Sequence, residues 1–226
     1  MYRYQLHTHT VPCSLCARMS PEELCRALYE GGYAGAVLTN HFFHGNTGVD
    51  RALPFADFVK PYIEDYEACK RAAEPYGLDI LFGLEEGVGG GLEILCYGLT
   101  PEILLRHPEL STSAAAVWHD VLHAEGVLVV QAHPFRERAY ITTPGPLPLA
   151  VIDGVEAYNR GNIGDENTRA CALAAKHPTL IVTSGADTHE PRSVAVGGIE
   201  TKRRIRTEAE LSEILRSGEY TPIALP

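Results

Sequence analysis

Short runs of apolar and β-branched residues recur along the chain, and most of them occupy consecutive rather than alternating positions. Consecutive apolar positions are typical of strands whose two faces are both buried, as in a parallel sheet. The predicted strands are Tyr2–His9, Ala34–Thr39, Asp79–Gly83, Glu93–Tyr97, Val127–Ala132, Val155–Tyr158 and Leu180–Thr183.

Helical signals separate many of these strands. Capping boxes predict helix starts at Ser20-Pro21-Glu22-Glu23 and at Thr207-Glu208-Ala209-Glu210, with ends at Gly31-Gly32 and at Gly218. Three further helices are predicted over Phe55–Ala73, with a kink or restart at Pro61, over Ser113–Glu125 and over Thr168–Lys176.

The alternation of strand and helix over about seven repeats predicts an α/β fold whose parallel sheet closes, or nearly closes, into a barrel. An open doubly wound sheet is the structural alternative. The 226-residue chain has no low-complexity linker and no break in composition, so a single domain over residues 1–226 is expected.

Charge and composition narrow the functional classes. The formal net charge of −10 makes the chain a poor general binder of nucleic acid or of an anionic membrane. No stretch approaches the ~18 apolar residues of a membrane span, and MYRYQLHTHT lacks the pattern of a signal peptide. The six cysteines lie mostly singly in apolar segments, which favours reduced thiols and a cytoplasmic protein.

Metal-binding side chains follow at least five of the predicted strands at their carboxyl ends. In a parallel barrel these ends share one face, where active sites are built. Imidazole and carboxylate together suit zinc, iron or manganese. The candidate ligands are His7, His9, His41, Glu85, Glu93, His133, Asp187 and His189. Four other histidines fall in helices or strand starts and are expected to be surface or packing residues: His107, His119, His123 and His177.

These residues occur in a recognisable order. The set His7-Thr8-His9-Thr10, Thr39-Asn40-His41, Gly83-Leu84-Glu85, Ala132-His133-Pro134 and Gly185-Ala186-Asp187-Thr188-His189 resembles the PHP (polymerase and histidinol phosphatase) family of metal-dependent phosphoesterases. The resemblance spans Gln5 to about Ile205. It implies a distorted (β/α)7 TIM-like barrel and two or three divalent metal ions (Zn, Mn or Fe).

The resemblance also implies a role for each ligand. His7, His9 and Asp187 would hold one metal, and Glu85 would bridge it to a second. His133 and Glu93 would complete the second site, although many family members carry histidine where Glu93 stands. A third metal would be held by His41 and His189.

The chain departs from the family pattern at two places. Family members usually carry aspartate where this chain has Asn40, and an aspartate or histidine in the loop after His9. Here that loop is Val11-Pro12-Cys13-Ser14-Leu15-Cys16, without carboxylate or imidazole, so two metals are the safer expectation. The Cys13-x-x-Cys16 pair allows thiolate contact with the metals, a reversible disulfide or simple packing. His44 is a possible substitute ligand, and Glu86 reads as a second, non-ligand carboxylate.

The expected reaction is hydrolysis of a small phosphomonoester or nucleotide by metal-activated water. His189 or His41 would protonate the leaving group. Phosphate oxygens are expected to meet guanidinium and amide groups in the strand-end loops. The candidates are Arg136 above all, then Arg138, Arg160, Arg192, Asn159 and Arg18.

Two other functional classes remain open. One is amidohydrolase-type C–N or C–O hydrolysis, although the predicted strand ends offer no bridging lysine. The other is a catalytically inactive metal-binding module, which the two departures motivate. The expected partner is a small phosphorylated molecule, without a membrane or a stable nucleic-acid complex, and the oligomeric state is open.

Overall fold

The computed structural model of the chain describes residues 1–223. The strands of these residues form two five-stranded sheets, in the orders β10-β9-β1-β2-β3 and β4-β5-β6-β7-β8. The first sheet comprises β1 (Tyr2–Thr8), β2 (Gly35–Leu38), β3 (Asp79–Phe82), β9 (Ile199–Thr201) and β10 (Tyr220–Pro222). The second comprises β4 (Leu84–Gly87), β5 (Glu93–Tyr97), β6 (Leu128–Gln131), β7 (Gly154–Asn159) and β8 (Ile181–Gly185).

The α/β class is confirmed, but the closed barrel is not confirmed, because residues 1–223 form two separate sheets. Parallel pairing joins β1, β2 and β3 in one sheet and β6, β7 and β8 in the other. Strands β4, β5 and β6 pair antiparallel, as does β9 with both of its neighbours. The reversal at β4 and β5 interrupts the all-parallel ladder that a (β/α)7 barrel requires. Two isolated bridges join the sheets, one between Thr8 and Thr188 and one between His41 and Glu85.

The chain passes from the first sheet to the second at Gly83. A Cβ atom there would lie 2.7 Å from a side-chain carbon of Val37 and 2.9 Å from the carbonyl oxygen of Cys96, so only glycine fits this crossing. Strand β4 follows at once and turns back as a hairpin with β5. The sequence analysis did not predict β4, because its two central residues are glutamates rather than apolar side chains.

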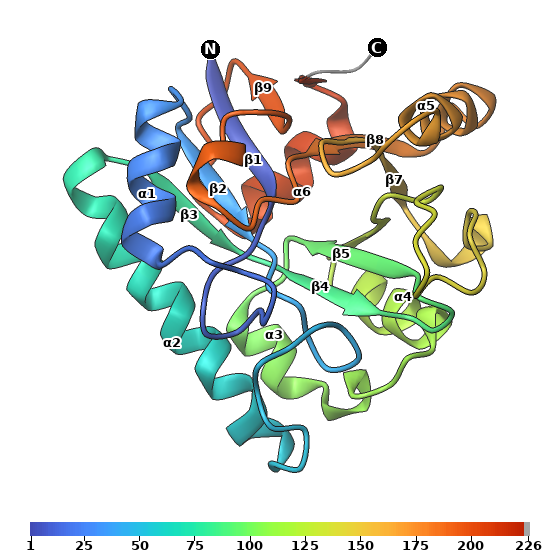
Figure 1. The fold of residues 1–226 in the computed structure, drawn as a ribbon, viewed down its shortest axis with the longest axis horizontal. Helices are drawn as coiled ribbons and strands as arrows, with labels where there is room; N and C mark the ends of the chain where they lie inside the picture. Colours follow the sequence, from blue (N-terminus) through green and yellow to red (C-terminus); the bar gives the residue numbers. More distant parts are fainter. Residues whose placement is uncertain (224–226) are drawn as a thin grey trace.

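Helices cover the two sheets from several sides, with α1 and α2 along one flank and α5 at the opposite end (Figure 1). They are α1 (Pro21–Glu30), α2 (Phe55–Ala73), α3 (Pro101–Arg106), α4 (Ala115–Ala124), α5 (Glu166–Lys176) and α6 (Glu208–Ser217). Short 3-10 turns are η1 (Glu74–Tyr76), η2 (Pro108–Leu110), η3 (Leu149–Val151) and η4 (Pro191–Ser193). The capping box at Ser20 is confirmed in both of its hydrogen bonds, and α2 continues through Pro61.

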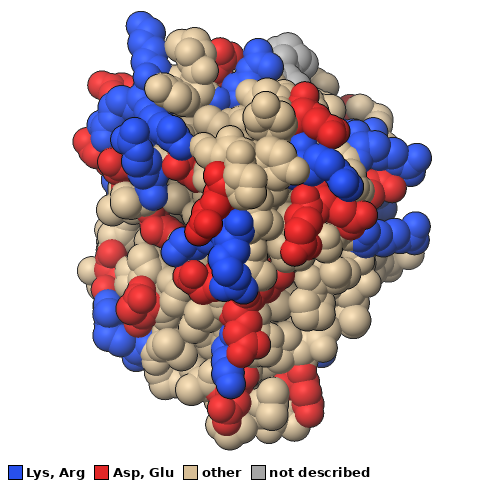
Figure 2. Space-filling view, turned by 90° about the vertical axis from the view of Figure 1, so that its left-hand side faces the viewer, with Lys and Arg blue, Asp and Glu red and all other residues tan. Residues whose placement is uncertain are grey.

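The surface mixes charges of both signs. On the face shown in Figure 2, lysine and arginine side chains alternate with aspartate and glutamate. No helix within residues 1–223 has both the length and the apolar character needed to cross a bilayer. All six cysteines are free thiols.

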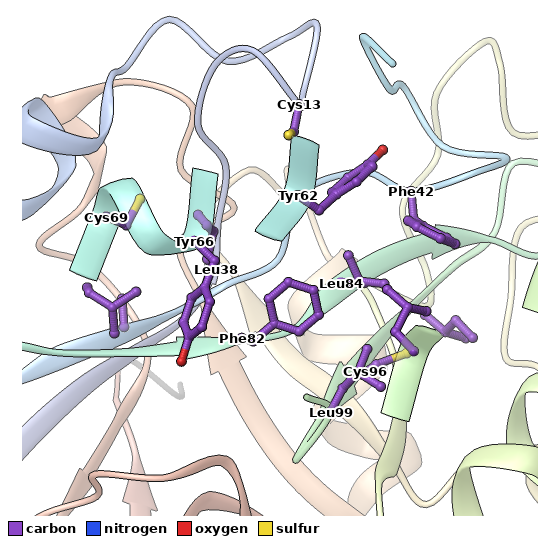
Figure 3. Packing of buried hydrophobic residues seen from close by; sticks show 14 of the residues in the cluster. Cys13, Leu38, Phe42, Tyr62, Tyr66, Cys69, Phe82, Leu84, Cys96 and Leu99 are labelled. Carbon is purple, nitrogen blue, oxygen red and sulfur yellow. The ribbon is translucent and has the colours of Figure 1, made fainter. Parts of the chain in front are cut away.

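The apolar core has two parts, one on each face of the strands. Leu38 and Phe82 pack against the side chains of α2, among them Tyr62 and Tyr66 (Figure 3). The preceding residues of the same strands, including Val37, point into a second cluster. Adjacent strand residues are therefore both buried, which confirms the interpretation of consecutive apolar positions. Burial of each such side chain contributes about 1.5–3 kcal/mol before entropy is counted.

Candidate metal centre

The fold brings all eight predicted ligands together at one edge of the two sheets. His7 lies in β1, His41 follows β2, and His133 follows β6. Glu93 is the first residue of β5 rather than the last. Because β5 runs antiparallel to its neighbours, its start lies at the same edge as the ends of the parallel strands.

Glu85 is the centre of this cluster. Its Oε1 atom lies 3.1 Å from His7 Nε2 and 3.2 Å from His133 Nε2. Its Oε2 atom lies 3.0 Å from His41 Nδ1 and 3.4 Å from His9 Nε2. One fully buried carboxylate therefore faces four imidazoles, which is the arrangement expected of a bridging ligand.

Two further carboxylates flank Glu85. Asp187 Oδ1 lies 3.3 Å from His9 Nε2 and 3.6 Å from His7 Nε2. The two oxygens of Glu93 each lie 3.4 Å from an imidazole nitrogen, one of His41 and one of His133. Ligand atoms approach within 4.8 Å of one another in three groups: His7, His9, Glu85 and Asp187; His41, Glu85 and Glu93; and His9, His41 and His189.

Several donor atoms of the cluster lack hydrogen-bond partners, as expected of atoms that bind a cation. His7 Nε2, His9 Nε2, His41 Nδ1 and Glu85 Oε2 are buried and make no hydrogen bond of acceptable geometry within residues 1–223. Leaving such a polar atom unsatisfied costs about 1–3 kcal/mol. Two donors bound at about 2.1 Å to one cation lie about 3.0–3.4 Å apart, close to the contacts around Glu85. Metal ions bound among these residues would give each of these four atoms a partner.

Groups behind the ligands fix their orientation. His7 Nδ1 lies 3.0 Å from Glu156 Oε1, while Glu156 Oε2 accepts hydrogen bonds from the His133 amide and from the Asn159 side chain. On the other side, His9 Nδ1 lies 3.2 Å from the Ser14 hydroxyl. Carboxylates behind metal-binding imidazoles set the tautomer and ring orientation. The sequence analysis missed Glu156, whose only signal is a charged residue inside an otherwise apolar strand.

Electrostatics in the cluster depend on its burial. Burial opposes protonation of His7, but the neighbouring carboxylates, Glu85 foremost, raise its pKa well above the usual value. Burial and the nearby His41 lower the pKa of His9 to about 3. Burial also opposes ionisation of Asp187, but His7 and Arg136 hold its pKa well below the usual range. Without cations, the cluster therefore needs protons to balance its carboxylates, and metal binding must release them.

The backbone is strained at two of the ligands. His133 has φ of 29° and Asp187 has φ of 52°, and they are the non-glycine residues with positive φ within residues 1–223. Such conformations cost about 1–3 kcal/mol each and persist where the surrounding structure enforces them, often in active sites.

The guanidinium of Arg136 is buried beside the cluster and firmly held. It lies 2.7 Å from Asp187 Oδ2, and it donates to Asn159 Oδ1 at 2.7 Å and to Asn162 Oδ1 at 3.1 Å. Arg138 is ion-paired with Glu166 at 2.7 Å. The predicted arginines therefore occupy different environments, and only Arg136 touches a metal-site carboxylate.

Two cavities open at the cluster. The larger, of about 700 Å³, is lined by Glu85, Glu93, His133, Arg136, Tyr140 and His41, among other residues. The smaller, of about 340 Å³, holds Arg18, Arg160 and Arg192. Cys16, Asp187 and His189 line both.

The two departures from the family pattern have structural counterparts. Cys16 lies beside His189 and His41, which outweigh its burial and lower the pKa of its thiol to about 6. Cys13 is fully buried, and burial raises the pKa of its thiol. Asn40 donates to the buried Asp65 of α2 at 2.7 Å, a residue that the sequence analysis did not single out.

The remaining histidines lie outside this centre. His44 contacts Glu86 at 2.7 Å, as a loop residue with a buried carboxylate partner. His119 and His123 stack on the surface of α4 and approach Asp153 at 4.0 and 3.6 Å. His119, His123 and Asp153 form a separate group, in which His123 is exposed and the other two are partly buried.

Comparison with known proteins identifies the fold. No family model matches the chain, and no curated protein matches it. Solved structures do match. A protein of Bifidobacterium adolescentis named as a metal-dependent phosphoesterase superposes with a TM-score of 0.54 at 17% identity, covering 84% of this chain and 88% of that one.

Two larger proteins contain the same fold. A two-domain protein of Bacteroides vulgatus, named for a PHP-like metal-dependent phosphoesterase, gives a TM-score of 0.62 at 14% identity over 98% of this chain. The lesion-specific endonuclease EndoQ of Pyrococcus furiosus gives 0.57 at 12% identity, also over 98%. This chain spans 64% and 57% of their lengths.

The fold and the cluster together define an α/β domain with a buried centre suited to divalent metal ions. At these identities the likeness establishes the fold, and the chain has the fold of the PHP-like metal-dependent phosphoesterases. This fold agrees with the fold that the resemblance of the motifs to that family implies.

Proposed function

We propose that the chain is a metal-dependent phosphoesterase acting on a small phosphomonoester or nucleotide. The observation that carries the proposal is the Glu85 carboxylate, which faces four imidazoles beside an open cavity of about 700 Å³. Three of those imidazoles have an orphaned nitrogen. The cavity leaves room for a substrate, which argues against an inert, fully enclosed metal site.

The residues would hold two or three divalent ions. His7, His9 and Asp187 form one ligand group, and Glu85 is shared with a second group containing Glu93 and His133. A third group would draw on His41 and His189, with Zn, Mn or Fe as the metals that suit imidazole and carboxylate. Bound cations would supply the positive charge that activates water and stabilises the negative charge of the phosphoryl oxygens in the transition state.

The chain's own residues supply orientation and proton transfer. Arg136 is held by Asp187 and Asn159 and lines the main cavity, so it can donate to a phosphate oxygen there without rearrangement. His189 is 28% exposed, and its Nδ1 lies 2.9 Å from the Asp187 carbonyl oxygen, to which it donates. The Nε2 atom is then the one available to protonate a leaving group.

His41 is the second candidate for this proton. Its Nδ1 already faces Glu85 at 3.0 Å and Glu93 at 3.4 Å, so it is committed to the cluster more fully than His189. With two bound ions, we therefore assign the proton to His189 and a ligand role to His41; with a third ion, His189 would be a ligand instead.

The test is phosphate release from a panel of phosphomonoesters and nucleotides, with manganese, iron or zinc added. His133→Ala is the variant, and His177→Ala, at the end of α5, is the matched control. Metal-dependent release that survives in the control and disappears in His133→Ala supports the proposal. Release that persists after chelation refutes it, and so does turnover of amides or lactones without any phosphate release.

A further inference from the structure

A second group of metal-binding side chains lies between α4 and the start of β7. His119 and His123 are four positions apart on α4 and therefore share one face of the helix, and Asp153 directly precedes β7. One ligand atom of each residue lies within 4.8 Å of the other two. We propose that these three residues form a second site for a divalent transition-metal ion, separate from the centre around Glu85, and that the bound ion tethers α4 to β7.

The Asp153 carboxylate is held in place for this role. Its Oδ2 atom accepts a hydrogen bond from the Val129 amide at 2.8 Å. The Asp153 amide donates to the Val129 carbonyl oxygen at 2.7 Å, and the Asp153 carbonyl oxygen accepts from the Ile181 amide at 3.0 Å, so β6 and β8 fix the main chain on both sides. The other carboxylate oxygen, Oδ1, faces the imidazoles, at 3.6 Å from His123 Nδ1 and 4.0 Å from His119 Nε2.

These separations suit ligands around a cation better than they suit hydrogen bonds. Both exceed the length of a side-chain hydrogen bond. His119 Nδ1 is also buried without a hydrogen bond within residues 1–223, so hydrogen bonding does not explain why this imidazole lies beside Asp153. Two donors bound to one cation lie about 3.0–3.4 Å apart, so each imidazole needs to approach Oδ1 by less than about 1 Å. The His123 side chain is 58% exposed and has room to make this movement.

The surroundings of the group favour a cation of the zinc type. His123 lies in the last turn of α4, where the backbone carbonyl groups concentrate negative charge. Two imidazoles and one carboxylate suit zinc, cobalt, nickel and copper, whereas magnesium and calcium prefer oxygen ligands alone. Three protein ligands leave a coordination position for water, which the exposure of His123 makes accessible from solvent.

This site is distant from the centre around Glu85. Asp153 precedes β7, and Asn159, which contacts Arg136 beside that centre, ends the same strand. Six residues of strand separate the two positions by about 20 Å. The helix nevertheless connects the two regions, because Ser113, two positions before α4, lines the main cavity. An ion that joins the last turn of α4 to β7 therefore restrains the helix whose start borders that cavity. The inference does not depend on the proposed hydrolytic function.

Zinc binding by the intact chain tests the proposal. Zinc content after equilibrium dialysis, and competition with a chromogenic chelator, are compared in the wild-type protein, His123→Gln and His177→Gln. The exposed His123 can be replaced without disturbing the core, and His177, at the end of α5, is the matched control. We expect His123→Gln to bind one zinc ion fewer per chain than the other two proteins. The affinity of this site should fall by at least about 10-fold, because even the loss of a partner behind a metal ligand costs that much.

Hydrogen exchange locates the ion. At a free zinc concentration of about 100 times the Kd, amides that exchange by opening of α4 should exchange up to about 100-fold more slowly. This protection should be absent in His123→Gln and kept in His133→Ala, which lacks a candidate ligand of the centre around Glu85. The inference is overturned if His123→Gln binds as much zinc as the wild-type protein with the same affinity, or if the protection of α4 is lost in His133→Ala and kept in His123→Gln.

Discussion

Asp65 is a buried carboxylate whose replacement should stabilise the protein at neutral pH. It lies in the middle of α2 and is 5% exposed. Its Oδ2 atom accepts hydrogen bonds from Thr10 at 2.5 Å and from Asn40 at 2.7 Å. Burial nevertheless outweighs these bonds and raises its pKa from 3.8 to about 6. This difference of about two pH units corresponds to about 3 kcal/mol.

The sign of the effect follows from proton binding. The folded protein holds the Asp65 proton to a higher pH than the unfolded chain does, so stability falls as the pH rises from 3.8 to about 6. Asp65→Asn keeps an oxygen acceptor for both hydrogen bonds and removes the ionisation. We expect a gain of about 2–3 kcal/mol at pH 7.5 and none at pH 4, or about 4–12 °C in Tm at the higher pH for a chain of this size.

Thermal unfolding of chelator-treated protein at both pH values measures this gain without a contribution from metal loss. Glu64→Gln, the exposed neighbour on α2, serves as the control and should change Tm little at either pH. In the converse variant, Asn40→Asp, a second carboxylate replaces the amide that donates to Asp65. It should destabilise the protein, and adding Asp65→Asn should rescue it. Equal gains at pH 4 and 7.5, or no gain at pH 7.5, would refute the reasoning.

Three further predictions concern the metal centre. Glu156→Gln removes the carboxylate behind His7 and should weaken metal affinity by about 10- to 100-fold, measured by competition with a chromogenic chelator; unchanged affinity would show that Glu156 does not position its neighbour. In chelated protein, Cys16 should alkylate faster than Cys13 at pH 7, because its thiol pKa is lowered to about 6 while burial raises that of Cys13. Mass spectrometry of the peptides gives the order, and the reverse order contradicts the prediction. Because the pKa of His7 is raised in the folded protein, the chelated protein loses stability as the pH rises above 6.5. Metal binding strengthens over the same range, because it releases protons from the ligands. The Tm difference between metal-loaded and chelated protein should therefore widen from pH 6 to pH 8. A constant or shrinking difference in scanning calorimetry would count against it.

The clustering of the eight candidate ligands was predictable from the sequence because most of them directly follow strands that the apolar pattern marks. His41 and His133 are the clearest examples, each coming after a run of consecutive buried residues. Parallel strands bring such positions to one edge whether or not the sheet closes. The candidate ligands therefore lie together although the closed barrel was not confirmed, and their roles as ligands stay a prediction.

The sheet topology was less predictable because it depends on how strands pair. Nothing in Leu84–Gly87 announces an antiparallel partner, and its two glutamates resemble a loop more than a strand. The residues that contact the candidate ligands from behind could not be predicted for a similar reason. Ser14 and Glu156 act through contacts with residues 5 and 149 positions away, and an isolated polar residue carries no sign of its tertiary partner.

The tertiary contacts of Asn40 explain why the chain departs from the family pattern at this position. Its Oδ1 accepts from the Thr10 amide and from the Ser14 hydroxyl, both at 2.8 Å. Its Nδ2 donates to Asp65. Aspartate at position 40 could accept the first two bonds but not supply the third, and would set a second negative charge against Asp65. The negative charge expected in the strand-end motif is thus carried by Asp65 of α2 instead, which Asn40 connects to the Ser14 hydroxyl that faces His9. Asn40 accordingly preserves the support of His9, a candidate metal ligand, and does not by itself signal a lost activity.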